Sequence, residues 1–243
     1  MRNLTRGKYR ARVARGAADM AALQVLRCEV FRGGACPDGD AHDDACLQVL
    51  VERVSTGDLV ACFRLLPLAK GAEIGRSYSA QHYELSALSA YDGPMVEVGR
   101  FCVKPGLMDP DVLRVAWGAL TQYVDDNDVA MLFGCSSFEG TETAAYADAF
   151  AVLHERHLAP KRWLPKVKAP DVFRFAAGKR ARPDRKKAMG LMPPLLKTYL
   201  AMGGWVSDHA VVDRDLGTLH VFTGLEVAAI PASRKRLLRA VAG

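Results

Sequence analysis

The chain has 243 residues, of which 50% are hydrophobic and 25% are charged, and its formal net charge is +6 at pH 7. This composition is typical of a globular protein with a sizeable core, and no apolar run approaches the roughly 20 residues that span a bilayer. The basic N-terminal stretch lacks the apolar segment and cleavage site of a signal peptide, so we expect a cytoplasmic protein.

Six cysteines are scattered along the chain without a CxxC pair: Cys28, Cys36, Cys46, Cys62, Cys102 and Cys135. Zinc sites usually have ligands at short, paired spacings, so we expect reduced thiols that serve mainly in packing, while a catalytic cysteine stays open. The HERH stretch at 154–157 places its histidines three residues apart, whereas a zincin helix needs them four apart. Phosphate-binding glycine loops are also missing. The sequence therefore predicts no metal site and no nucleotide cofactor.

The N-terminal part combines strands with one helix. Residues 8–15 alternate like a strand, and residues 17–31 place apolar side chains at helical spacing. A loop rich in Gly and Asp follows over 33–44. Two further apolar runs, 46–54 and 59–67, are separated by the turn STGD, which predicts a β-hairpin.

Two strands and two helices are predicted next, over 95–103, 108–126, 129–138 and 140–157. Asp109 and Thr141 are the expected caps of the two helices, because short polar side chains accept hydrogen bonds from the first free N–H groups. A short helix over 193–204 and two strand-like stretches complete the order. These elements imply an α/β or α+β fold with helices on a mixed sheet.

A change in composition near residue 178 suggests how the chain is divided. The stretch 178–188 is basic and contains proline, which predicts a flexible connector. We therefore expect a core over 1–177 and a C-terminal extension over 189–243 that packs on this core.

The strand MVEVGRFCV, over 95–103, carries Glu97 and Arg100 among its apolar residues. Burying either charge without a partner is costly, so a plain core strand should not contain them. A three-residue spacing puts the two side chains on opposite faces of a flat strand, but a bulge at Gly99 would turn both to one side. The pair therefore predicts an acid–base site.

Further polar residues lie inside or beside apolar elements. Arg27 and Phe31 are four residues apart and share a face of the first helix. The other members are Asp40, Asp43 and Asp44 of the loop, Arg64 in a strand, and Ser136 and Ser137 at a strand end. Each has an ordinary interpretation as a surface charge, a turn or a cap, and a purely structural ion-pair network stays open for the arginines. Together they form a candidate site.

Several segments resemble a known family. LRCEVFRG, DAHDDACLQVLV, GDLVACFRLLP and EVGRFCV follow, in order and spacing, the pattern of acyl-homoserine-lactone synthases and their relatives in the GNAT superfamily. Within that pattern, LFGCSSFEGT, LHERHLAP and MPPLLKTYLAMGGWVSDHAVVDRDLGTLHV resemble the ornithine N-acyltransferases of ornithine-lipid biosynthesis. The resemblance runs from about residue 8 to residue 222. It implies a GNAT-like mixed, mostly antiparallel central sheet with helices on both faces.

The resemblance also implies a reaction and a role for each candidate residue. The α-amine of L-ornithine would attack the thioester of a 3-hydroxyacyl chain on acyl carrier protein, giving lyso-ornithine lipid. Glu97 would be the general base, acting through water, with Arg100 beside it. The loop aspartates would bind the cationic ornithine side chain, oriented by the arginines. Phe31, Ser136 and Ser137 would contact the substrate.

The resemblance further implies which acyl donor is used. GNAT enzymes that use acetyl-CoA carry a pyrophosphate-binding R/Q-x-x-G-x-G/A loop, which this chain lacks. The donor would be the 4′-phosphopantetheine arm of acyl carrier protein, with no other cofactor. The basic residues expected to attract the acidic carrier protein are Lys161, Arg162, Lys179, Arg180 and Arg182. The basic C-terminal segment is alternatively suited to anionic lipid at the inner face of the cytoplasmic membrane.

Other functions remain open at this point. One is an acyl-homoserine-lactone synthase, although those enzymes carry a tryptophan after the VF segment that this loop lacks. Another is an N-acyltransferase for glutamine or lysine. A third is a basic module that binds nucleic acid, which leaves Glu97 unexplained, so we expect no nucleic-acid partner.

Overall fold

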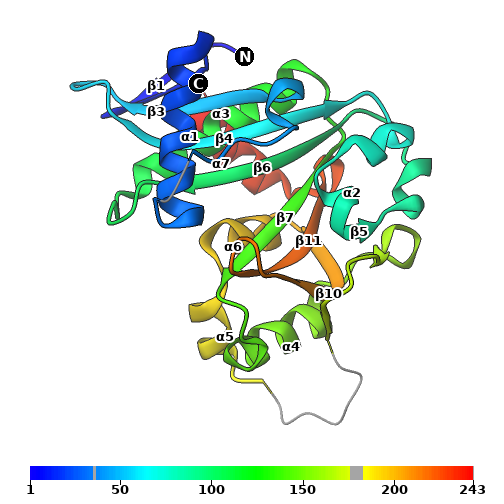
Figure 1. Cartoon of the computed structure of the whole chain (residues 1–243). Coiled ribbons are helices and arrows are strands. Elements are labelled where there is room, and N and C mark those ends of the chain that lie inside the picture. Colours follow the sequence, from blue (N-terminus) through cyan, green and yellow to red (C-terminus); the bar gives the residue numbers. More distant parts are fainter. Residues whose placement is uncertain (35–36, 176–182, 243) are drawn as a thin grey trace. The chain divides into compact units, whose positions relative to one another are not determined.

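A computed structural model of the chain describes residues 1–34, 37–175 and 183–242 (Figure 1). Tertiary contacts divide the chain into two compact units, which are described separately. Unit 1 consists of Met1–Pro67, Val96–Ala130 and Pro231–Gly243, and unit 2 consists of Leu68–Met95 and Met131–Ile230. Among the described residues, no helix combines the length and the apolar character that crossing a membrane requires.

Unit 1 is built on a sheet of five neighbouring strands. In sheet order these are β1 (Leu4–Arg6), β2 (Tyr9–Val13), β3 (Leu47–Arg53), β4 (Leu59–Leu68) and β6 (Met95–Val103). The first four are paired antiparallel, and β3 and β4 form the predicted hairpin. The N–H of Lys104 bonds to the Val60 carbonyl and Cys62 lies against Cys102, so β6 also runs antiparallel to β4.

Helices cover both faces of this sheet, as the resemblance implies. They are α1 (Gly16–Arg32), α3 (Pro110–Asp126) and α7 (Ala232–Ala242), with the 3-10 turn η1 (Asp43–Ala45). Leu26 of α1 packs in one buried cluster with Leu50 and Cys62. Leu4 lies on the opposite face, where a Cβ added to Gly118 of α3 would come within 2.6 Å of it. Since side chains alternate along a strand, α1 and α3 lie on opposite sides.

Unit 2 contains a second set of antiparallel strands. In order they are β7 (Met131–Glu139), β11 (Thr218–Glu226), β10 (Trp205–Asp213) and β9 (Val172–Arg174). Its helices are α2 (Ser79–His82), α4 (Ala147–Arg156), α5 (Arg185–Leu191) and α6 (Pro194–Ala201), and β5 (Tyr83–Glu84) pairs with β8 (Lys166–Val167). Short 3-10 turns are η2 (Gly71–Arg76), η3 (Ser86–Ala90), η4 (Thr143–Tyr146), η5 (Lys161–Trp163) and η6 (Val227–Ala229). An apolar cluster joins α4, α5 and α6 to β10 and β11.

The predicted fold class is confirmed, and two local predictions differ. Asp109 caps α3 as expected, with its carboxylate accepting from the Asp111 N–H. Thr141 does not cap a helix, because α4 begins only after the turn η4 and has Tyr146 at its N-terminal boundary. Residues 185–188 of the expected connector are helical, since Asp184 caps α5. Residues 178–182 of that connector lie outside the described residues, so the division of the chain at 177 and 188 remains a prediction.

Candidate functional site

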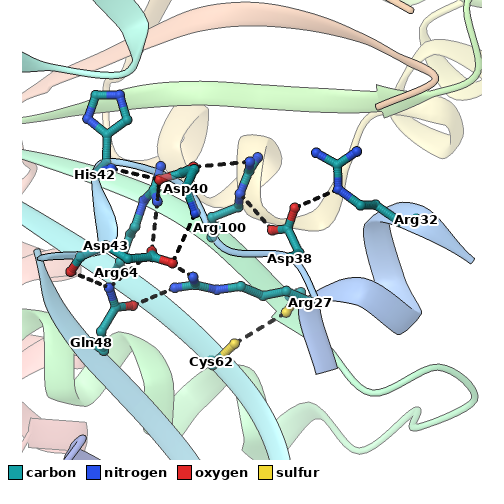
Figure 2. Close-up of polar contacts among 11 residues, drawn as sticks. Arg27, Arg32, Asp38, Asp40, His42, Asp43, Gln48, Cys62, Arg64 and Arg100 are labelled. Atoms are coloured by element: carbon teal, nitrogen blue, oxygen red, sulfur yellow. Dashed lines mark hydrogen bonds and ion pairs between the residues drawn. The ribbon is translucent and has the colours of Figure 1, made fainter. Parts of the chain in front are cut away.

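The acidic loop, residues 37–44, connects the end of α1 to the start of β3. Helix α1 ends at Arg32 and is capped by Gly33, whose left-handed φ of 63° suits a residue without a side chain. The loop then turns back along the helix, and the N–H of Asp38 bonds to the Gln24 carbonyl. This path brings three aspartates of the loop next to arginines from α1, β4 and β6, as Figure 2 shows. We call this group the arginine–aspartate cluster; it consists of Arg27, Arg32, Asp38, Asp40, Asp43, Gln48, Arg64 and Arg100.

Asp43 is the central acid of the cluster. Its Oδ1 accepts hydrogen bonds from Nη1 of Arg27 at 2.8 Å and from Nη1 of Arg64 at 2.9 Å. Gln48 binds both partners of the Arg27–Asp43 ion pair: its side-chain nitrogen donates to Asp43, and its side-chain oxygen accepts from Arg27. The side chains of Arg27 and Asp43 are 0% and 6% exposed. A buried charge needs such a partner, so these side chains hold one another in place.

Asp40 links Arg64 to Arg100 at the edge of the cluster. Its carboxylate accepts from Nη1 of Arg64 at 2.5 Å, from the His42 N–H at 2.9 Å and from Nη2 of Arg100 at 3.2 Å. Its side chain is 24% exposed, whereas that of Asp43 is almost completely covered. Asp44, in the turn η1, is exposed and no ion pair of it is found among the described residues. Of the three predicted aspartates, Asp40 is therefore the bonded one that still reaches solvent.

Asp38 was not predicted, although it lies in the same loop sequence as the other acids. It is 2% exposed and pairs with Nε of Arg100 at 3.0 Å and with Nε of Arg32 at 2.8 Å. Gln48 and Arg32 were missed as well. The clustering of Asp38 with the predicted acids in PDGDAHDD was the available signal.

The charges of the cluster are nearly balanced. Four arginines meet three aspartates, so the cluster has one more positive charge than negative charges. Burial alone would raise the pKa of Asp40 and Asp43, but the hydrogen bonds and positive charges of the arginines outweigh it. Both pKa values are held below the ordinary 3.8. The acids are therefore ionised at neutral pH.

Strand β6 is irregular where the charges occur. Arg100 has a φ of 48°, in the left-handed region that residues other than glycine rarely adopt. The sequence predicts an irregularity, a bulge, at Gly99, whereas the left-handed conformation occurs at the next residue, Arg100. Gly99 instead leaves room for the side chain of Arg64, because an added Cβ would lie 3.3 Å from Nε of Arg64. The guanidinium of Arg100 lies 5.7 Å from the centre of the Phe31 ring, which brings that predicted residue to the edge of the cluster.

Glu97 lies close to the cluster and is 6% exposed. The charge of Glu97 acts on the thiol of Cys46, as do the charges of Asp40 and Asp43, and this indicates that Glu97 lies near the cluster. Burial raises the pKa of Cys46 to about 11, and the negative charges of Glu97, Asp43 and Asp40 also act to raise it. At neutral pH the Cys46 thiol therefore keeps its proton, which does not favour the alternative of a nucleophilic cysteine at this position.

The remaining predicted residues lie in unit 2 or outside the described residues. Ser136 of β7 is buried and its hydroxyl accepts from Thr223, while Ser137 is exposed. Arg162 is exposed, pairs with Glu226 at 3.6 Å and stacks on Trp163, and Lys161 is also exposed. Three predicted carrier-protein contacts fall in 176–182 and are not described: Lys179, Arg180 and Arg182.

The geometry of Asp43 predicts a large effect on stability. Asp43→Asn keeps the shape of the side chain but leaves Arg27 and Arg64 buried without their shared charge. We expect the free energy of unfolding to fall by about 3–5 kcal/mol, as when one partner of a buried ion pair is removed. The exposed neighbour supplies the control, because Asp44→Asn should change stability by less than about 0.5 kcal/mol. Equal urea midpoints for the two variants would contradict the buried role of Asp43.

The lowered pKa of Asp40 predicts how the protein responds to acid. Its carboxyl has a lower pKa folded than unfolded, so its contribution to stability is complete above the unfolded value and lost as the pH falls through the folded value. As the pH falls below about 4, the unfolding free energy of the wild type should therefore fall more steeply than that of Asp40→Asn. Urea titrations at a series of pH values measure both slopes. Parallel curves would show that Asp40 is not held by the arginines in solution.

Comparisons with known proteins address the family of the chain. A model of the Acetyltransferase (GNAT) domain matches residues 26–118, a range that contains Arg27, Arg64, Glu97 and Arg100. Among solved structures, an N-acyl amino acid synthase from uncultured soil microbes is 9% identical, with a TM-score of 0.49 and 96% of each chain covered.

Two curated relatives match almost the whole chain. The L-ornithine N(alpha)-acyltransferase of Rhodobacter capsulatus is 34% identical over 238 residues, which cover 91% of each protein. That of Brucella abortus is 30% identical over 247 residues, covering 92% of this chain and 86% of the relative. At this identity and coverage, the chain belongs to the L-ornithine N(alpha)-acyltransferase family.

Proposed function

We propose that the protein transfers a 3-hydroxyacyl chain from acyl carrier protein to the α-amine of L-ornithine, giving lyso-ornithine lipid. As a member of its family the chain is an N-acyltransferase, and the observation that carries the substrate is 34% identity over 91% of both proteins. The buried carboxylate of Glu97, within the residues that match the GNAT domain, supplies a group suited to the chemistry. A soluble amino acid and a thioester-bound acyl chain are then the two substrates.

Glu97 is the proposed general base. A free α-amine has a pKa of about 8, so only a weakly held proton has to be removed before the nitrogen can attack. Glu97 accepts this proton through water, and the amine adds to the thioester carbonyl. Backbone N–H groups at the irregular segment of β6 around Arg100 stabilise the resulting oxyanion. When this intermediate collapses, the C–S bond breaks, the thiol of the carrier arm leaves with a proton, and the amide remains.

Asp40 is the proposed partner of the ornithine side chain. Asp40 and Asp43 are both ionised and each accepts hydrogen bonds from two arginines, but the Asp43 side chain is only 6% exposed. Asp40 is 24% exposed, so a cation can approach it from solvent. In this assignment Arg64 and Arg100 position Asp40 rather than contact the substrate. Asp44 is exposed, but no arginine is found to support it among the described residues.

The proposed donor is acyl carrier protein, whose 4′-phosphopantetheine arm brings the acyl chain, so the reaction needs no other cofactor. Carrier proteins are acidic, and the net charge of +6 favours their approach. Helix α7 adds Arg234 and Arg236 to the exposed basic residues of unit 1, and Lys235 between them is half-buried. These charges also suit anionic lipid, and we propose that the reaction takes place in the cytoplasm, at or near the inner membrane face.

The product identifies the reaction directly. Expression in a bacterium that lacks amino-acid lipids should yield a new amphiphile with one hydroxylated fatty acid in amide linkage to ornithine. Mass spectrometry of the lipid extract detects it, and a vector without the gene is the control. A new lipid that contains glutamine or lysine in place of ornithine would show that this amino acid is the acceptor. No new lipid, with folded protein and ornithine present, would contradict the proposal.

Substitution of Glu97 tests the mechanism. Glu97→Gln keeps the shape of the side chain and removes its basicity, so kcat with acyl carrier protein and ornithine should fall ~10²-fold or more. The melting temperature should hold or rise, because a desolvated carboxylate costs folding energy. Glu29→Gln, at an exposed position of α1, is the matched control and should leave kcat unchanged. Clear destabilisation with near-normal kcat would instead make Glu97 a structural ion-pair partner.

A further inference from the structure

Three potential metal ligands meet in unit 2, away from the acidic loop in sequence. They are His82 at the end of α2, Asp213 at the end of β10 and His220 in β11, and one ligand atom of each lies within 4.8 Å of the others. More than a hundred residues separate His82 from the other two along the chain. The arginine–aspartate cluster is different, since its carboxylates already accept from guanidinium groups.

The hairpin of β10 and β11 explains why two of these side chains share a face. Asp213 pairs with Thr218 across the hairpin, and His220 is two residues beyond Thr218. Because side chains alternate along strands, all three point to the same side. The Thr218 hydroxyl is buried, and no hydrogen-bond partner for it is found among the described residues. This face therefore holds polar groups that the surrounding protein does not fully satisfy.

His220 is held with one ring nitrogen ready to bind a ligand. Its side chain is 2% exposed, and its Nδ1 lies 3.1 Å from the Tyr83 hydroxyl. That hydroxyl also contacts the His220 carbonyl oxygen at 2.8 Å, and a carbonyl only accepts. The single phenol proton is thus used there, so the phenol oxygen accepts from Nδ1–H. Nε2 then carries the lone pair, is buried, and has no hydrogen bond among the described residues.

We propose that His82, Asp213 and His220 bind a Zn²⁺ ion. Two imidazoles and one carboxylate are a ligand set that zinc accepts, and three protein ligands leave a fourth position for water. Hard cations such as Mg²⁺ and Ca²⁺ prefer oxygen ligands and fit this set poorly. Tetrahedral zinc with bonds of ~2.0–2.1 Å holds its ligands roughly 3.4 Å apart, so the side chains close in on the ion. Tyr83 fixes the tautomer of His220, the usual role of a hydrogen-bond partner behind a zinc histidine.

The ion would connect two distant parts of unit 2. His82 and Tyr83 belong to the segment α2–β5, while Asp213 and His220 belong to the hairpin β10–β11. A bond network through the metal ties this segment to the hairpin and stabilises the folded unit. The inference does not rest on the proposed function, because it concerns residues outside the proposed acyl-transfer machinery.

The test uses the full chain without an affinity tag, stripped of metal with a chelator and dialysed. Titration with Zn²⁺ in a calorimeter should show about one equivalent bound, and zinc should raise the melting temperature of the protein. His82→Gln and Asp213→Asn should each weaken zinc binding at least ~10-fold. Asp213→Asn keeps the acceptor that receives the Leu216 N–H, so the turn after β10 should still form. Tyr83→Phe should weaken binding ~10-fold without removing a ligand.

His154→Gln is the matched control, because His154 lies exposed on α4 of the same unit. It should bind zinc as the wild type does. Co²⁺ replaces zinc as a spectroscopic probe, and visible bands of a tetrahedral ion without a thiolate charge-transfer band would place it on nitrogen and oxygen. Circular dichroism confirms that each variant is folded. A folded wild type that binds no zinc, a thiolate band, or affinities of His82→Gln and Asp213→Asn equal to that of His154→Gln would each overturn the proposal.

Discussion

The buried carboxylate of Asp43 fixes the arrangement of unit 1. Arg27 is completely covered by the packing of α1 on the sheet, so its charge is acceptable only where a negative partner meets it. That partner comes from the acidic loop, which must therefore fold back under α1. Because Arg64 shares the same oxygen, the register of β4 is tied to the helix as well. Helix, loop and strand are positioned by one group.

Strand β6 connects this ion-pair network to the proposed reaction site through Arg100. Arg100 reaches Asp38 and Asp40 from a left-handed backbone conformation that costs about 1–3 kcal/mol for a residue with a side chain. Its ion pairs offset that cost. The backbone at Arg100 departs from the extended conformation of a strand, and in the proposed mechanism peptide N–H groups of this segment stabilise the oxyanion. The proposed reaction site thus contains a residue with a strained backbone conformation.

Much of this could be predicted because the signals are local. Periodicity placed β3, β4, β6, α1 and α3 within a few residues, and the unexpected charges Glu97 and Arg100 pointed to the candidate site. Partner choice is not local. Asp38 and Asp44 look alike in the sequence, yet the former is buried between two arginines and the latter is exposed. Thr141 failed as a cap because the segment around it forms a turn before α4, which its sequence does not reveal.

The way unit 1 is assembled affects its synthesis on the ribosome. Its last segment contains α7, which packs on α3 and whose Ala240 and Ala242 carbonyls accept hydrogen bonds from Arg6 and Gln122. All of unit 2 beyond residue 130 is translated before this helix emerges. Until then the surface of α3 that receives α7 is uncovered in the nascent chain. Unit 1 can therefore be completed only after residues 131–230 of unit 2 have been translated.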